Sequence, residues 1–229
     1  MTFYGEPRLL LAGDSALVVE FGDEISLEVN RKVHALADAL GKASLPGLGE
    51  AVPTYRSLLI HYDPLRLSCD EVKAFVSEVL QTCEEKLPLK PRVVEIPVVY
   101  GGESGPDIEF VAEHSGLFSV EEVIRLHSGA AYTVYMLGFA PGFAYLGGMP
   151  EAIATPRLET PRTLVPAGSV GIAGEQTGIY PIATPGGWRL IGRTPLKLFD
   201  PEHDPPTLLK AGDTVRFVPI SEGGEWGGS

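Results

Sequence analysis

Basic residues are scarce in this sequence of 229 residues. Lysine and arginine together number 18 against 30 aspartates and glutamates, which gives a formal net charge of -12. Nucleic-acid binding depends on cationic side chains that neutralise phosphates, so this balance argues against nucleic acid as a partner. The sequence also has no uninterrupted apolar run long enough to cross a bilayer, and we expect no membrane-spanning helix.

Cysteine is scarce as well, and the common metal and nucleotide motifs are absent. Cys69 and Cys83 lie in one predicted helix, where a rise of 1.5 Å per residue separates them by about 21 Å. A disulfide requires Cα atoms within about 7 Å, so we expect none between them. The sequence has no CxxC, HExxH or GxxxxGK[ST] motif, which argues against a structural zinc site and a P-loop. The first residues lack the basic and apolar segments of a signal peptide, and we expect a cytoplasmic location.

Glycine and proline are unevenly distributed along the chain. Residues 1–100 contain only 6 of the 27 glycines and 7 of the 20 prolines. In this part, alternating strand patterns and helical apolar faces predict a small α+β domain at 1–88, with two helices on one face of a sheet. Ser68 and Glu71 form a capping box, which indicates where the second helix begins. The predicted strands are 15–21, 50–55 and 57–62, and the apolar helical faces cover 29–40 and 72–83.

The second part of the chain has a different pattern. The proline-containing segment 87–91 predicts an extended connector, and we place the domain boundary between residues 88 and 89. From Tyr132 to Pro219, short apolar runs are interrupted by glycine or proline every 8–12 residues. This spacing is typical of an all-β barrel or sandwich, so we expect a β domain at 89–220. The tail 221–229 has no packing pattern, and we expect it to be frayed.

Three further elements are predicted ahead of these β runs. A strand at 92–100 contains Pro97, which is typical of a sheet edge. A helix follows at 107–114, and a second helix begins at the capping box formed by Ser119 and Glu122.

Positive charge gathers in one region of this acidic chain. Residues 126–199 contain five bases and three acids. An arginine side chain grips a carboxylate or phosphate through two parallel hydrogen bonds, so Arg157 and Arg162 are candidates for binding an anion. The alternative is that these arginines lie on solvated barrel faces.

Aromatic residues alternate with glycine and proline in the segment 138–148, too densely for a regular strand. Phe139, Phe143 and Tyr145 could form rigid walls around a ligand. If nothing covers them, they form an exposed patch of the kind found at protein interfaces. A glycine-bent barrel corner is the alternative.

His127 ends an apolar helical series, and it is either a half-buried histidine at a helix C-terminus or a general base. The segment 167–171 (AGSVG) resembles a nucleophile elbow, with Asp200 and His203 in hydrolase order after it. That elbow requires a helix after the serine, and the glycine-rich residues that follow do not predict one. We therefore set the catalytic triad aside.

Two long runs carry a resemblance to a known family. They are TVYMLGFAPGFAYLGGMP and VPAGSVGIAGEQTGIYPIATPGGWRLIGRTP, with TPR at 155–157 and again at 160–162 between them. Together with GDSALVVEFGDEIS near the N-terminus, they resemble the allophanate-hydrolase subunit 1 family over nearly the whole chain. The resemblance implies a small α+β domain followed by a cyclophilin-like β-barrel.

The resemblance also implies a function. The family includes the B subunit of an ATP-dependent 5-oxoprolinase, which opens 5-oxoproline to glutamate with a homologous barrel subunit of the C type and a third subunit. ATP would be the co-substrate, and the sequence leaves open which chain binds it. A Kip-type inhibitor of a sensor histidine kinase and a subunit of another amide or urea-type hydrolase are the alternatives. Prolyl isomerisation rests on fold alone, which is a weak warrant.

Roles for individual residues follow from that chemistry. Arg157 and Arg162 would supply cations for a carboxylate and a phosphoryl group, and His127 would move a proton. Aromatic and neutral groups would line the substrate site; these are Phe139, Phe143, Tyr145, Gln176, Thr177 and Tyr180, with the backbone of Gly186 and Gly187.

Overall fold

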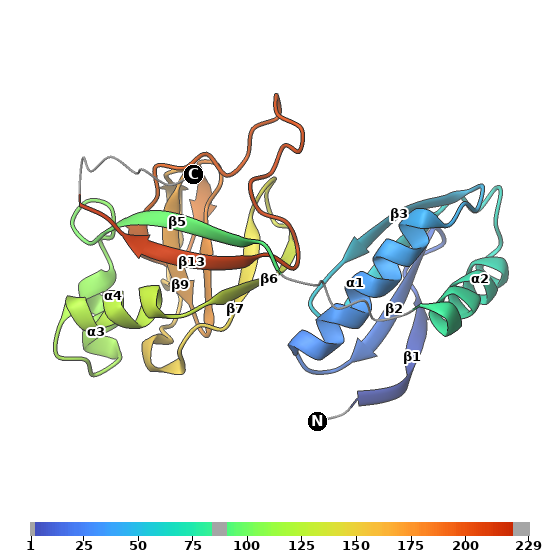
Figure 1. Ribbon diagram of the computed structural model, residues 1–229, viewed down its shortest axis with the longest axis horizontal. Helices are drawn as coiled ribbons and strands as arrows, with labels where there is room; N and C mark the ends of the chain where they lie inside the picture. The colour runs from blue at the N-terminus through green and yellow to red at the C-terminus, as the bar shows by residue number, and fades with distance from the viewer. Residues whose placement is uncertain (1–2, 84–90, 222–229) are drawn as a thin grey trace. The chain divides into compact units, whose positions relative to one another are not determined.

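The computed structural model describes residues 3–83 and 91–221. The chain divides into two compact units, residues 1–89 and 90–229 (Figure 1). The predicted boundary between residues 88 and 89 and the predicted frayed end at 222–229 lie outside the described residues. Each unit has its own hydrophobic core.

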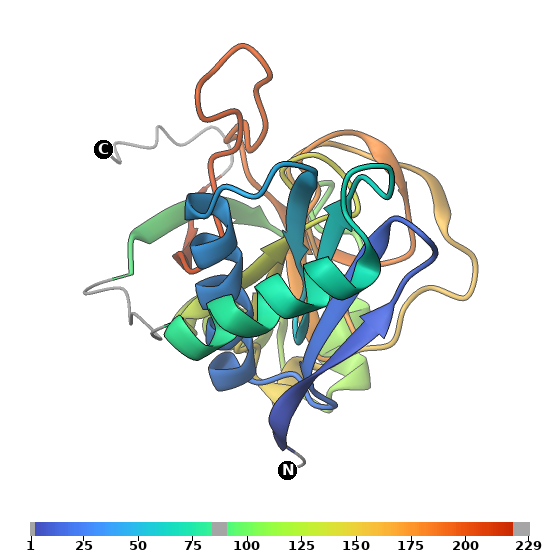
Figure 2. The same ribbon diagram turned by 90° about the vertical axis from the view of Figure 1, so that its right-hand side faces the viewer.

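The first unit is a four-stranded antiparallel sheet in the order β1-β2-β4-β3. Figure 2 shows both helices over the same face of this sheet. Their apolar faces pack with the inward strand residues into one core, as the helical spacing predicts. The elements are β1 (Phe3–Leu11), β2 (Ala16–Gly22), α1 (Leu27–Lys42), β3 (Leu48–Pro53), β4 (Ser57–Tyr62) and α2 (Cys69–Thr82).

The ends of these elements follow local sequence signals. The predicted capping box at α2 is confirmed, since the side chains of Ser68 and Glu71 each bond the backbone amide of the other residue. Strand β1 was not predicted, because Gly5 and Pro7 interrupt its pattern. Its register shifts between Phe3 and Arg8, where these two residues lie.

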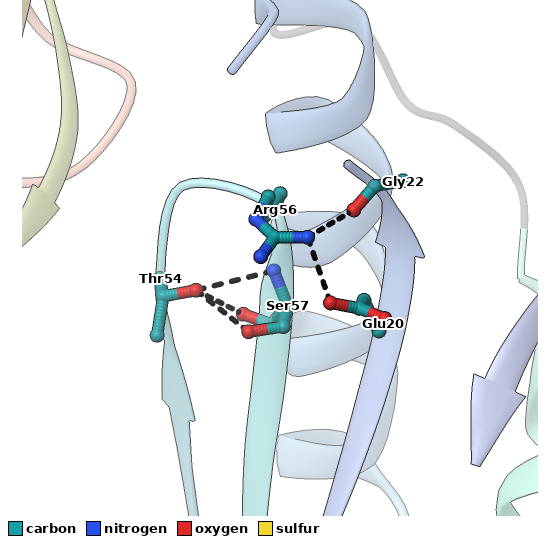
Figure 3. Close-up of polar contacts among 5 residues, drawn as sticks. All are labelled: Glu20, Gly22, Thr54, Arg56 and Ser57. Atoms are coloured by element: carbon teal, nitrogen blue, oxygen red, sulfur yellow. Dashed lines mark hydrogen bonds and ion pairs between the residues drawn. The ribbon is translucent and has the colours of Figure 1, made fainter. Parts of the chain in front are cut away.

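The turn between β3 and β4 is fixed by side chains (Figure 3). Arg56 Nη1 donates to Glu20 Oε1 at 2.7 Å and to the Gly22 carbonyl at 2.6 Å. Thr54 Oγ1 accepts from the Ser57 amide at 3.1 Å. These bonds join the β4 end of the turn to β2 and stabilise the turn.

The second unit is built on a closed barrel of seven strands in the order β10-β7-β6-β13-β5-β12-β9. The fold class is therefore confirmed as a small α+β domain followed by a β-barrel. Two further strands, β8 and β11, form a separate antiparallel pair. The elements are β5 (Val93–Tyr100), α3 (Ile108–His114), α4 (Val120–Gly129), β6 (Tyr132–Leu137), β7 (Ala144–Gly147), η1 (Glu151–Ile153), β8 (Arg162–Val165), β9 (Ser169–Ala173), β10 (Gln176–Ile179), β11 (Thr184–Gly186), β12 (Arg189–Arg193) and β13 (Thr214–Pro219).

The prediction that Pro97 marks a sheet edge is wrong. β5 is one of the strands of the closed barrel wall and has a neighbour on each side, β13 and β12. The Val98 carbonyl accepts from the Ile220 amide on the β13 side, so the backbone of Pro97 faces the other way. On that side of β5, β12 pairs with Val99 and Tyr100 and not with Pro97. Because no strand amide is needed at Pro97, the proline interrupts no hydrogen bond between the strands.

The second predicted capping box is also wrong. α4 follows Ser119, but the Glu122 carboxylate accepts from the amide of Phe118 at 2.9 Å, one residue earlier than a capping box requires. No helix among the described residues is long and apolar enough to span a membrane.

Candidate functional site

The two predicted anion-binding arginines, Arg157 and Arg162, are called the arginine pair below. Arg162 is the first residue of β8, and its guanidinium is already engaged. Nη2 lies 2.8 Å from Asp107 Oδ1, and Nη1 donates to the Trp188 carbonyl at 3.3 Å. Arg157 lies exposed between η1 and β8. Within residues 3–83 and 91–221, no ion pair joins it to an acid.

Asp107 was missed as a site residue. It precedes α3, where an aspartate is ordinarily a helix cap, but its side chain makes no cap bond. Oδ2 instead accepts from the Leu190 amide at 2.6 Å, while Oδ1 pairs with Arg162. The carboxylate is buried and therefore orients the guanidinium with little freedom.

Tyr180 follows directly after β10, and its phenol lies within electrostatic reach of the arginine pair. Its side chain is buried, and burial raises the pKa of its phenol, while the backbone of Trp188 and the charges of Arg157 and Arg162 act in the opposite direction. A Cβ placed on Gly186 would lie 2.5 Å from the Tyr180 hydroxyl oxygen. Glycine is thus what allows β11 to lie against this hydroxyl.

Aromatic rings pack against Tyr180 in a small cluster that is separate from the main core of the barrel. The Phe143 ring centroid lies 5.1 Å from that of Tyr145, 5.7 Å from Tyr180 and 5.6 Å from Trp188, all edge-on. Such T-shaped pairs are the favoured aromatic geometry. The expectation that Phe143 and Tyr145 are exposed is wrong for Phe143, which is buried, and Tyr145 is half-buried.

Phe139 alone of these loop aromatics is exposed, at 66% of its surface. It lies in loop 138–142, between β6 and β7, and its φ of 67° is in the left-handed region. A shallow depression of about 420 Å³ lies at this loop, lined by residues 137–142 and Thr207. A large side chain in that conformation is rare and marks the loop as a second candidate site.

His127 lies inside the barrel. Tyr100 and Thr177 occupy its two ring nitrogens, with the Tyr100 hydroxyl 2.7 Å from Nδ1 and Thr177 Oγ1 2.9 Å from Nε2. Thr177 donates its own hydrogen to the Gly171 carbonyl at 3.0 Å. Its oxygen must therefore accept from Nε2–H, and Nδ1 accepts from Tyr100. The Phe217 ring lies 4.4 Å from the imidazole between centroids.

Burial lowers the pKa of His127 from 6.5 to about 3, so the ring is neutral near pH 7. The prediction of a half-buried histidine is wrong in degree: the residue lies in the last turn of α4, as expected, but is fully buried. Protein groups hold both ring nitrogens, and neither of these bonds involves the arginine pair.

The remaining predicted residues lie in different places. Thr177 is buried beside His127 and is not available as a surface donor. Gln176 begins β10 four residues before Tyr180, a separation of roughly 13 Å along a strand. Gly187 packs near Pro161, 3.6 Å from where a Cβ would lie. Of the predicted set, the structure therefore brings together Arg157, Arg162, Tyr180 and Gly186, with Phe143 packed against the Tyr180 ring.

The described residues contain no group of three or more histidines, cysteines or acids placed to hold a metal ion. The arrangement around Tyr180 offers two cations and one hydroxyl donor, which suits a carboxylate or a phosphoryl group. These are the ligand types to test there.

Residues 7–209 match the family model of the carboxyltransferase domain, subdomain C and D. The match includes most of both units, and the chain belongs to this family. It is 53% identical over 220 residues to the 5-oxoprolinase B subunit of Bacillus subtilis (strain 168), covering 92% of this chain and 91% of the relative. It is 48% identical to the 5-oxoprolinase B subunit of Escherichia coli O157:H7, covering 94% and 97%. The family resemblance expected from the motifs is confirmed.

Solved structures agree with this assignment. A conserved uncharacterized protein from Pyrococcus horikoshii is 57% identical, with a TM-score of 0.57 over 94% of this chain and 99% of that chain. The Kluyveromyces lactis urea carboxylase has a TM-score of 0.75 at 20% identity and covers 96% of this chain and 23% of that chain. The second likeness shows a common fold.

Proposed function

We propose that this chain is the B subunit of a 5-oxoprolinase, which hydrolyses 5-oxo-L-proline to L-glutamate and consumes ATP. The observation that carries the proposal is the identity of 53% and 48% to two relatives of that name, over more than nine-tenths of this chain. A cytoplasmic location is part of the same proposal.

The chemistry needs the groups that surround Tyr180. Hydrolysis adds water across the lactam C–N bond, so the carbon gains an oxygen and the nitrogen becomes the amine of glutamate. An amide carbon resists water, and transfer of the ATP γ-phosphoryl group to the lactam oxygen would activate it. Water would then add to the activated carbon, and the C–N bond would break as the nitrogen takes up a proton, which leaves an acyl phosphate. A second water would hydrolyse that acyl phosphate to the carboxylate of glutamate and inorganic phosphate. Both the substrate carboxylate and the phosphoryl group are anions, and arginines stabilise such groups in the ground and transition states.

The two arginines have different surroundings, which suits them to different tasks. Arg162 is held by Asp107 at 2.8 Å, so its remaining N–H groups are oriented in advance. Arg157 is exposed and has no acid partner among the described residues, so a substrate anion would be its first partner. The Tyr180 hydroxyl, on which the charges of both arginines act, would add one donor.

The proposal assigns ATP to the assembled enzyme and the lactam contacts to the arginine pair. A homologous barrel subunit and a third subunit would complete the assembly. The relatives are themselves named as one subunit of an enzyme, which supports the presence of partner subunits.

The test is an assay of the purified assembly. The chain is co-expressed with its partner subunits, and glutamate release from 5-oxoproline is measured with and without ATP. We expect ATP-dependent turnover by the assembly and none by this chain alone. Arg157→Ala should reduce turnover at least tenfold, while Arg193→Ala, an exposed arginine in β12, serves as the matched control. A complete assembly that releases no glutamate would overturn the proposal and favour a regulatory role without turnover.

A further inference from the structure

Phe139 is a fixed, exposed aromatic side chain. Its ring lies edge-on to the buried Phe143 ring, with 5.5 Å between centroids. Three backbone bonds close the loop around it, from Gly138 N to Phe143 O at 3.1 Å, from Ala140 N to Gly138 O at 2.8 Å and from Phe143 N to Ala140 O at 3.0 Å. A phenylalanine held in the left-handed region costs about 1–2 kcal/mol. That cost is offset by the surrounding structure, which orients the ring before anything binds.

An acidic arm, residues 199–207, rises from the barrel next to this loop (Figure 1). Its base is closed by the bridge between Phe199 and Thr207 and by the bond from the Asp200 amide to the Pro206 carbonyl at 2.7 Å. Residues 201–206 are exposed. Within it, Asp200 pairs with Lys197 at 2.8 Å and lies 2.9 Å from His203 Nδ1, and Glu202 and Asp204 add two further negative charges at exposed positions.

The loop and the arm form one continuous surface. Thr207 lines the depression beside residues 137–142. A Cβ on Gly142 would lie 2.9 Å from Phe199 Cβ, so the loop packs directly on the base of the arm. None of the residues that line the depression is charged. The surface is therefore apolar at its centre and acidic at one side.

We propose that loop 138–142 and the acidic arm form the docking surface for the homologous barrel subunit. The partner would present an apolar side chain to the depression and Lys or Arg side chains to the arm. This inference rests on the proposed function, because that function requires partner subunits. An apolar centre with a charged rim is the usual composition of a protein interface.

The charges argue against a second copy of this chain as the occupant. A twofold dimer brings the same patch of both copies together, so each acidic arm would approach the other. Like charges placed across an interface cost affinity. A small anionic ligand is disfavoured by the same acids. A basic partner is attracted by them, and attraction of this kind raises the association rate at low salt.

The experiment measures binding of the purified full-length chain to the purified barrel subunit by calorimetry. Phe139→Ser should weaken binding at least tenfold, because a central aromatic residue is a typical hot spot. Phe118→Ser is the matched control, since Phe118 is 99% exposed in the loop before α4. Phe139→Tyr retains the ring and should restore most of the affinity.

The arm is tested by charge reversal. Glu202→Lys with Asp204→Lys should weaken binding severalfold and reduce its dependence on salt. Glu103→Lys with Glu113→Lys makes the same change in net charge at exposed positions elsewhere on this unit and should have little effect. Circular dichroism of each variant shows whether the fold is retained.

The outcomes separate this inference from the proposed function. Wild-type affinity in Phe139→Ser, no binding of the barrel subunit by the wild-type chain, or self-association through Phe139 would each overturn the docking surface. If the wild-type assembly forms through Phe139 but does not hydrolyse 5-oxoproline, the proposed function fails and the docking surface stands.

Discussion

The Asp107 carboxylate accepts from the Arg162 guanidinium at 2.8 Å and, with its other oxygen, from the Leu190 amide at 2.6 Å. These residues come from the start of α3, from β8 and from β12. One buried carboxylate thus joins the β8–β11 pair to the barrel wall. Among the described residues, no acid pairs with Arg157 as Asp107 pairs with Arg162, so the two arginines should respond differently to substitution.

Arg162→Ala should lower the free energy of unfolding by about 1–3 kcal/mol, because it leaves a mostly buried carboxylate without its cation. Arg157→Ala changes an exposed side chain and should stay within about 0.5 kcal/mol of the wild type. Urea unfolding of the purified chain measures both. Equal stability losses in the two variants would contradict the structural distinction.

The lysine variant tests whether Arg162 also binds substrate. Arg162→Lys keeps the charge but loses the planar pair of donors that meets Asp107 and Trp188 together. Activity of the assembly should fall roughly ten- to hundredfold, nearly as far as in Arg162→Ala, as expected when a charge-assisted contact is lost. Full activity of Arg162→Ala at unchanged stability would exclude any role in binding.

The local features of the fold were predictable from the sequence. The helical spacing of apolar residues identified the buried faces of α1 and α2, and the Ser68–Glu71 pair identified the start of α2. β1 was not predictable, because its pairing with β2 outweighs the glycine and proline within it. The strand pattern of β5 was identified correctly, but its place in a closed barrel depends on β13, more than 100 residues away.

The candidate site was predictable only in part, for a similar reason. Composition pointed to Arg157 and Arg162, but the partner of Arg162 lies 55 residues earlier in the chain. The spacing of aromatic residues in the sequence could not show that Phe139 is exposed whereas Phe143 is buried. The difference between them depends on whether Tyr180 and Trp188 cover the ring, which is a tertiary contact.

The buried His127 should make stability depend on pH. In the unfolded chain it takes up a proton near pH 6.5, but in the folded chain only near pH 3. Between these values the unfolded state binds more protons, so the histidine's contribution to stability is lost as pH falls. The loss should approach about 1.4 kcal/mol per pH unit. Tyr100 and Tyr132 also face the ring, and burial raises the pKa of both, so neither titrates in this window.

Unfolding by urea at several values from pH 7 to pH 4 measures this slope. His127→Gln should be less stable at pH 7, and its stability should fall less steeply with acid than that of the wild type. His61→Gln changes an exposed histidine of β4 and should keep the wild-type slope. A slope in His127→Gln equal to that of the wild type would show that folding does not lower the pKa of His127.

Adjacent glycines provide a sharp test of the position of Tyr180. A Cβ on Gly186 would lie 2.5 Å from the Tyr180 hydroxyl oxygen and 2.8 Å from Cε1, whereas at Gly187 the nearest atoms, those of Pro161, are 3.6 Å away. Gly186→Ala should therefore force the buried ring to shift and cost about 1–3 kcal/mol of stability. Gly187→Ala should be tolerated.

The same pair of variants reports on function, because a shift of Tyr180 would move its hydroxyl relative to the charges of Arg157 and Arg162. Activity of the assembly should fall in Gly186→Ala and persist in Gly187→Ala. Adding Tyr180→Phe removes the oxygen that meets the new methyl group, so it should recover part of the stability but not the activity. A double-mutant cycle from thermal or urea unfolding measures this coupling. If the effects of Gly186→Ala and Tyr180→Phe on stability are additive, the close approach of β11 to the phenol is not what constrains residue 186.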